Sequence, residues 1–112
     1  MKKIEAIIRN FKLSEVRLAL SAIGISSMTI TEVAGLGHQE GYIENYRGIK
    51  NHVDFLNNLK IEIIVADELI DDCIEVICSA ARTGQVGDGK IFVTDVEKII
   101  RIRTGEENEN AV

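Results

Sequence analysis

The sequence predicts an α+β fold built from two copies of a strand–helix–strand unit. Three observations predict it: two stretches that alternate apolar and polar residues, an amphipathic helical stretch after each of them, and a β-rich stretch after each helix. The chain has 112 residues, 46% of them hydrophobic, which is enough for one compact domain and too few for two. We therefore expect a single domain over residues 1–112.

The first unit begins with residues 3–9, which alternate apolar and polar side chains as a half-buried strand does. Residues 12–24 carry apolar side chains three and four positions apart, the spacing of an amphipathic helix. Ser14 is a candidate cap for its start, and Gly24 suits the left-handed position after its end. Residues 28–35 are rich in β-branched residues and predict a strand.

The second unit repeats this order. Residues 59–66 alternate, residues 67–82 have helical spacing with acidic residues in the first turn, and residues 90–96 predict a strand. Right-handed crossovers then place both helices on one face of a four-stranded antiparallel sheet. This arrangement is the ferredoxin-like fold.

The other face of the predicted sheet has no helix to cover it. Ile7 and Ile64 fall on that face among charged neighbours. A monomer seldom exposes a large contiguous apolar patch, so we expect burial against copies of the chain in a closed ring. Scattered surface isoleucines, which need no partner, are the alternative.

Composition excludes several classes of function. The formal net charge of −5 argues against a general binder of nucleic acid or anionic membranes. Cys73 and Cys78 have neither the spacing of a zinc site nor the density of a disulfide framework, and we expect both to be buried thiols. No apolar run approaches the ~20 residues of a membrane span, and the N-terminal residues lack a signal-peptide pattern. The cytoplasm is the expected compartment.

The glycine loop, residues 82–90, is the first candidate binding element. Gly84 to Lys90 matches GxxxxGK, in which backbone N–H groups wrap phosphate oxygens and the lysine adds charge. However, Ile91 stands where a phosphate-binding P-loop has Ser or Thr, and the loop connects a helix to a strand rather than a strand to a helix. The motif alone is therefore equally consistent with an unstructured turn.

Arg101 and Arg103 are the second candidate element. If the segment around them is extended, both guanidinium groups point to the same side, since alternate residues of a strand share a face. Two guanidinium groups near a glycine loop with a lysine make a polyanion site plausible. Two solvated arginines at a sheet edge are the alternative.

The segment between the two units, residues 36–55, has no sustained period and is longer than most connections in compact domains. We interpret it as a candidate effector arm. It contains His38 and His52, which leaves a metal-responsive module open as an alternative. No nucleophile and base stand out, so an enzyme is not expected; a small acylphosphatase-like phosphotransfer enzyme on the same fold is the remaining enzymatic hypothesis.

Long motifs carry a resemblance to a known family. They are "MKKIEAIIR", "MTITEVAGLGHQEG", "YRG", "VDFL", "KIEIIV", "ARTGQVGDGKIFV" and "IRIRTGE", which together span essentially the whole chain. The sequence resembles the PII nitrogen-regulatory signal-transduction proteins of the GlnB and GlnK type, and GlnK-type regulators most of all. The resemblance implies a homotrimer of ferredoxin-like subunits with a T-loop (37–55), a B-loop (here the glycine loop) and a C-terminal segment (100–112).

The resemblance also implies ligands: ATP or ADP between subunits and, with Mg²⁺-ATP, 2-oxoglutarate. The implied phosphate contacts are Gly87, Asp88, Gly89 and Lys90, with Arg101 and Arg103 from the neighbouring subunit. The residues implied around the adenine are Ile7, Thr29, Gly35, Glu62 and Ile64, and those bordering the phosphates are Gly37, His38 and Gln39. The implied effector site comprises Gln39, which is also the Mg²⁺ ligand, Gly41, Asn58 and Gly87.

As implied by the resemblance, the partner is an ammonium transporter or another nitrogen-metabolism protein, so a membrane is reached only through that partner. Arg47 matches the arginine that plugs the transporter pore in GlnK-like proteins. Asn58 replaces a lysine that neutralises 2-oxoglutarate, and Asn51 and Ile49 replace a uridylylated tyrosine and a phosphorylated serine. We therefore expect no such covalent switch. The alternative function is a ferredoxin-like trimeric scaffold or metal-responsive module that senses no nucleotide.

Overall fold

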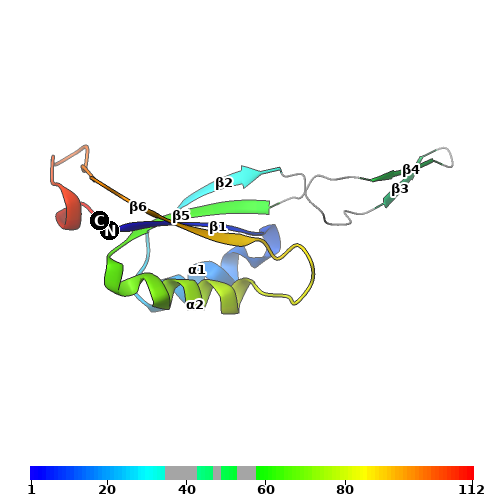
Figure 1. Cartoon of the computed structure of the whole chain (residues 1–112), viewed down its shortest axis with the longest axis horizontal. Helices are drawn as coiled ribbons and strands as arrows, with labels where there is room; N and C mark the ends of the chain where they lie inside the picture. Colours follow the sequence, from blue (N-terminus) through cyan, green and yellow to red (C-terminus); the bar gives the residue numbers. More distant parts are fainter. Residues whose placement is uncertain (35–42, 47–48, 53–57) are drawn as a thin grey trace.

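The computed structural model of the chain describes residues 1–34, 43–46, 49–52 and 58–112, and within 43–46 and 49–52 it describes the backbone only. Figure 1 shows the elements in sequence colours. The strands and α-helices, in chain order, are β1 (Lys2–Arg9), α1 (Leu13–Ala22), β2 (Thr29–Val33), β3 (Ile43–Tyr46), β4 (Ile49–His52), β5 (Asn58–Val65), α2 (Ile70–Ala81) and β6 (Lys90–Asp95). Short 3₁₀ turns occupy Asn10–Lys12, Asp67–Leu69 and Asn108–Asn110.

Four of the strands form one sheet in the order β2-β5-β1-β6, and every neighbouring pair is antiparallel. Both helices pack on the same face of this sheet (Figure 1). The ferredoxin-like arrangement predicted from the two strand–helix–strand units is confirmed. No helix in the described part of the chain is long and apolar enough to cross a bilayer.

The hydrophobic core fills the space between the sheet and the two helices. It takes alternate residues of the central strands and the inward faces of the helices, as the periodicities predict. Each fully buried aliphatic side chain contributes about 1.5–3 kcal/mol to stability. The core residues are Ile4, Ala6, Ile8, Val16, Leu20, Leu59, Ile61, Ile63, Val65, Cys73, Ile77 and Ala81. Cys73 is buried as predicted, whereas Cys78 is half-buried, because it lies on the flank of α2 beside a cavity.

Of the two residues predicted to terminate α1, Gly24 is confirmed and Ser14 is not. Ser14 does not cap the helix, because a 3₁₀ turn precedes α1 and leads the chain directly into helical geometry at Leu13, with no side-chain cap hydrogen bond. At the other end Gly24 has a φ of 90°, the left-handed conformation expected of it. The N–H groups of Gly24 and Ile25 donate to the carbonyls of Ser21 and Leu20 and so satisfy the last turn.

The segment 36–55 contains regular structure that the absence of a period did not predict. β3 and β4 pair with each other in antiparallel register, Ile43 opposite His52 and Tyr46 opposite Ile49. They form a separate two-stranded sheet. In the sequence, two residues that include Gly48 separate the strands, which is a hairpin signal, but each strand has just four residues and shows little alternation.

The face of the main sheet opposite the helices carries the residues predicted for it. Ile7 and Ile64 are half-buried there, and charged side chains alternate with them along β1 and β5. The charges pair along each strand: Lys3 Nζ lies 2.8 Å from Glu5 Oε1, and the Lys60–Glu62 pair spans 3.2 Å. The hydrogen bond from Lys3 lowers the pKa of Glu5. Among the described residues, no helix covers this face.

The C-terminal segment is not extended, so the prediction that Arg101 and Arg103 share one side of a strand is wrong. The chain turns back on itself: the N–H of Arg101 donates to the carbonyl of Glu106 at 2.9 Å, and the N–H of Gly105 donates to the carbonyl of Arg101 at 2.7 Å. Gly105 has a φ of 73°, which permits this reversal. Residues 101–106 therefore form a turn, which the alternation of Ile and Arg in residues 100–103 did not predict.

Candidate functional site

The glycine loop (82–90) connects the end of α2 to the start of β6 and lies beside the C-terminal end of β1 (Figure 1). Ile7 is the β1 residue that pairs with Lys90, the first residue of β6. At Gly89 the two backbones approach so closely that an added Cβ atom would overlap the carbonyl group of Ile7, and the φ of Gly89 is 98°. A glycine is therefore required where the loop enters the sheet.

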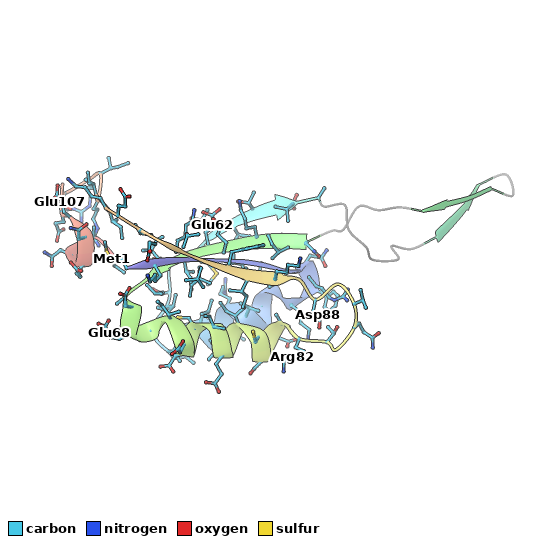
Figure 2. All side chains as sticks on the ribbon, in the orientation of Figure 1. Met1, Glu62, Glu68, Arg82, Asp88 and Glu107 are labelled. Atoms are coloured by element: carbon cyan, nitrogen blue, oxygen red, sulfur yellow. The ribbon has the colours of Figure 1, made fainter. Side chains whose placement is uncertain are left out.

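Asp88 organises the interior of the loop (Figure 2). Its carboxylate accepts hydrogen bonds from the N–H of Thr83 at 2.8 Å and the N–H of Gly84 at 2.9 Å. It also accepts one from the hydroxyl of Thr83 and one from Arg9 Nε. These donors, Thr83 first among them, hold the pKa of Asp88 well below its usual value of 3.8.

The side chain of Asp88 is engaged within the loop. Its carboxylate oxygens already accept four hydrogen bonds and carry the same sign of charge as a phosphate. The side chain therefore shapes the loop, and the phosphate contact implied at this position stays a prediction. Sequence reasoning missed two of its partners, Arg9 and Thr83; the adjacency of Thr83 to the glycines was visible, whereas the approach of Arg9 depends on the fold.

Cationic side chains surround the loop in an otherwise acidic protein. Arg82 and Lys90 are exposed at its two ends, one after α2 and one at the start of β6. A cavity of about 280 Å³ opens between α2 and this end of β1 and β6, with an apolar floor that includes Ile8 and Ile77. Exposed cations beside backbone N–H groups with left-handed glycines make the loop suited to an anion.

A second set of predicted residues lies away from the loop on the bare face. Thr29 pairs with Glu62, and Ile64 pairs with Lys3 rather than with Ile7. Because Ile7 pairs with Lys60, it is four strand positions from Ile64, about 13 Å at 3.3 Å per residue. The two isoleucines therefore do not form one continuous apolar surface within a protomer.

Arg101 and Arg103 are further still from the glycine loop. Lys90 begins β6 and Asp95 ends it, a length of about 17–20 Å, and the arginines follow beyond that end. Figure 2 shows the same separation, with Asp88 and Arg82 at one end of the domain and Met1 and Glu107 at the other. Arg103 is exposed, whereas Arg101 Nη1 lies 3.2 Å from Glu106 Oε1. One protomer thus does not bring Lys90 together with the two arginines.

Several predicted residues fall outside the described part of the chain: Gly35, Gly37, His38, Gln39, Gly41 and Arg47. Asn58 is described; it is the first residue of β5 and pairs with Arg9 on one side and Val33 on the other. His52 belongs to β4, where the backbone alone is described. Within the described residues, no cluster of three or more His, Cys, Asp or Glu side chains is arranged to hold a metal.

The fold and the site together define a class of protein: a small ferredoxin-like domain whose glycine loop places backbone N–H groups beside exposed cationic side chains. The profile of the family described as "Nitrogen regulatory protein P-II" matches residues 1–106. The chain is 62% identical over 112 residues to the "Nitrogen regulatory protein P-II" of Pasteurella multocida (strain Pm70) and of Haemophilus influenzae, with 100% of each chain covered. It is 56% identical to "Nitrogen regulatory protein P-II 1" of Escherichia coli (strain K12), again with 100% of both chains covered.

The chain therefore belongs to the P-II family and is a nitrogen signal-transduction regulator. Members of this family regulate targets in nitrogen metabolism, so a partner of that kind is expected. The GlnK-type assignment stays a prediction.

The close approach at Gly89 gives a first testable prediction. Gly89→Ala should lower the free energy of unfolding by more than about 2 kcal/mol, because the new methyl group meets backbone of β1 that has no rotamer to adopt. Gly84→Ala is the matched control, since Gly84 has a similar φ of 84° but open space around it, and should cost about 1 kcal/mol. Urea denaturation at one protein concentration measures both. Equal losses would show that the contact with Ile7 is unimportant.

The carboxylate of Asp88 gives a second testable prediction. Its pKa is lower in the folded chain than in the unfolded chain, so the stabilisation is complete well above pH 3.8, declines as pH falls below that value, and is lost as pH falls through the folded pKa. The stability difference between the native protein and Asp88→Asn should shrink accordingly. In a carboxyl ¹³C NMR titration, Asp88 should still be ionised at pH 3.8. Half-protonation of Asp88 at or above pH 3.8 would contradict this network.

Proposed function

We propose that the protein is a homotrimeric sensor that binds ATP or ADP between neighbouring protomers, and that nucleotide occupancy governs the T-loop (37–55). The observation that carries the proposal is the division of the ligand residues between two ends of the domain. Ile7 and the glycine loop lie at one end, Thr29 and Glu62 lie near the middle of the sheet, and Ile64, Arg101 and Arg103 lie toward the opposite end. A site that uses both sets needs two protomers.

The phosphates are assigned to the later half of the glycine loop. The N–H groups of Thr83 and Gly84 already donate to Asp88, and that of Gln85 donates to the hydroxyl of Thr83. The backbone donors at residues 86–89 are therefore the ones assigned to phosphate oxygens, with Lys90 supplying charge. This assignment keeps Gly87 and Gly89 as phosphate-binding positions.

The neighbouring protomer contributes Arg101 and Arg103 to the same phosphates. Arg101 must first exchange Glu106 for a phosphate oxygen. This exchange costs little, because both side chains are about two-fifths exposed, 39% and 44%, and exposed pairs of this kind contribute about 0–1 kcal/mol. A polyphosphate carries more charge than one carboxylate and competes effectively for the guanidinium group.

The adenine is assigned to a pocket between Ile7 of one protomer and the second set of the next. Ile64 supplies apolar surface there, and Thr29 and Glu62 supply polar groups that can distinguish one base from another. Glu62 is now paired with Lys60 and keeps 27% of its side chain exposed, so it is accessible to a ligand. Burial of the half-buried isoleucines between protomers also accounts for their place on the bare face.

Mg²⁺ and 2-oxoglutarate are proposed to bind at the base of the T-loop. The metal ligand implied by the resemblance, Gln39, lies outside the described residues, as does Gly41. A bound Mg²⁺ would supply a positive centre that a keto-acid and the phosphates share. Asn58 lies at the start of β5, where the T-loop segment re-enters the sheet, and lacks the positive charge of a lysine. We therefore propose that 2-oxoglutarate binds weakly.

An ammonium transporter is the proposed target. Support comes from the family, which regulates nitrogen metabolism, and from Arg47, which matches the pore-plugging arginine of GlnK-like proteins. Asn51 and Ile49 leave no modifiable side chain at the two positions that relatives modify. Nucleotide state is thus the proposed switch, and it acts through its differential affinity for T-loop conformations.

A mixed-trimer experiment tests the shared site. Lys90→Ala and Arg103→Ala proteins should each lose ATP and ADP binding in calorimetry, because each homotrimer lacks one cation in every site. Chains of the two variants that are unfolded and refolded together should recover binding, because a mixed trimer contains a junction with both Lys90 and Arg103 intact. Absence of recovery, with native protein that does bind, would show that the two residues do not serve one site between protomers. If native protein binds neither nucleotide at millimolar concentration, a scaffold is favoured instead.

The effector assignment is tested at Asn58. Asn58→Lys should strengthen 2-oxoglutarate binding in the presence of Mg²⁺-ATP by about ten-fold or more, since a hydrogen bond to a charged group contributes about 1.5–3 kcal/mol. Asn57→Lys adds the same charge one position away and serves as the control for non-specific attraction. Calorimetric titration measures both. An identical gain in the two variants would mean that position 58 makes no direct contact with the effector.

A further inference from the structure

Arg9 connects the glycine loop to the main sheet. It is the last residue of β1, and its guanidinium group reaches two points of the loop. Its Nε donates to Asp88 Oδ1 at 3.1 Å, and its Nη2 donates to the carbonyl of Val86 at 2.8 Å. The side chains of Arg9 and Asp88 are 24% and 25% exposed, so the pair is largely shielded from water.

These two hydrogen bonds differ from the others in the loop. The bonds that Thr83 and Gly84 donate to Asp88 join one part of the loop to another and fix its internal shape. Among the side-chain hydrogen bonds of the described residues, those from Arg9 are the ones that join the loop to a strand. They hold the segment 86–88, which includes three of the four backbone donors assigned to phosphate.

The positive charge of Arg9 is paired with a carboxylate inside the protomer. Its guanidinium group faces the ionised carboxylate of Asp88, whose other hydrogen bonds come from neutral groups of the loop. The remaining contact of Arg9 is with a backbone carbonyl. Arg9 therefore differs from Lys90, whose side chain is exposed and available to an anion.

We propose that Arg9 is a positioning residue, which holds the glycine loop in the conformation that accepts phosphate without itself contacting the ligand. The planar fork of the guanidinium group allows one side chain to bond a carboxylate and a carbonyl at fixed separation, which an ammonium group does less well. The consequence for ligand binding rests on the proposed nucleotide function, whereas the effect on loop order does not.

The effect on the loop is measured on ligand-free protein by amide hydrogen exchange. In Arg9→Ala, the amides of Thr83 and Gly84 should exchange about ten-fold faster, because the carboxylate that they bond loses its tie to the sheet. Arg9→Lys, which keeps one charged donor, should lie between Arg9→Ala and native protein. Arg17→Ala removes an exposed arginine of α1 and should leave these amides unchanged. Unchanged exchange in Arg9→Ala overturns the proposal.

The effect on the ligand is measured by titration of the same proteins with ATP and ADP. Arg9→Ala should weaken binding about three- to ten-fold, since affinity falls with the fraction of loops in the competent conformation. Arg9→Lys, which keeps the charge but not the planar fork, should weaken binding by a smaller amount and keep the native dependence of affinity on salt, whereas Lys90→Ala should flatten that dependence by removing a charge that salt screens.

The outcomes separate the two hypotheses. Native nucleotide affinity in Arg9→Lys despite faster loop exchange would mean that binding needs only a positive charge at this position, and would overturn the positioning role. Faster loop exchange with unchanged nucleotide affinity would overturn it as well. If native protein binds neither nucleotide, the proposed function fails, while the exchange measurement still decides whether Arg9 orders the loop.

Discussion

The antiparallel register of the sheet is the constraint on which the rest of the structure depends. It places the glycine loop and Ile7 at one end of the domain and carries Ile64 and the C-terminal arginines toward the other. No side-chain motion within a protomer closes a separation of this length. A phosphate group that contacts both Lys90 and the C-terminal arginines must therefore lie between protomers.

Contacts within the protomer hold the glycine loop in place. Gly89 lets its backbone reach β1, the carboxylate of Asp88 gathers N–H groups within it, and Arg9 ties it to the sheet. Under the proposed function, a loop held in this way would lose little entropy when the nucleotide binds. The protein as a whole is acidic, with a net charge of −5, so attraction of an anion depends on the local cations rather than on the overall field.

The sequence predicted the central part of the fold because burial there is strictly periodic. In β5, Leu59, Ile61, Ile63 and Val65 are buried and the residues between them are not, which is the pattern that the alternation predicts. Prediction failed where local hydrogen bonds that the periodicity does not reveal decide the backbone conformation. A 3₁₀ turn displaced the role expected of Ser14, and hydrogen bonds between Arg101 and Glu106 bent a segment whose residues alternate like a strand. Arg9 was missed for a different reason, because its partners are more than 70 residues away in the chain.

A structure of the purified protein with bound ADP tests the central claim most directly. The account predicts a trimer in which one ADP molecule contacts Lys90 of one protomer and Arg103 of its neighbour, with the adenine near Ile7 of the first and Ile64 of the second. A monomer, or ADP whose contacts all come from a single protomer, would contradict it.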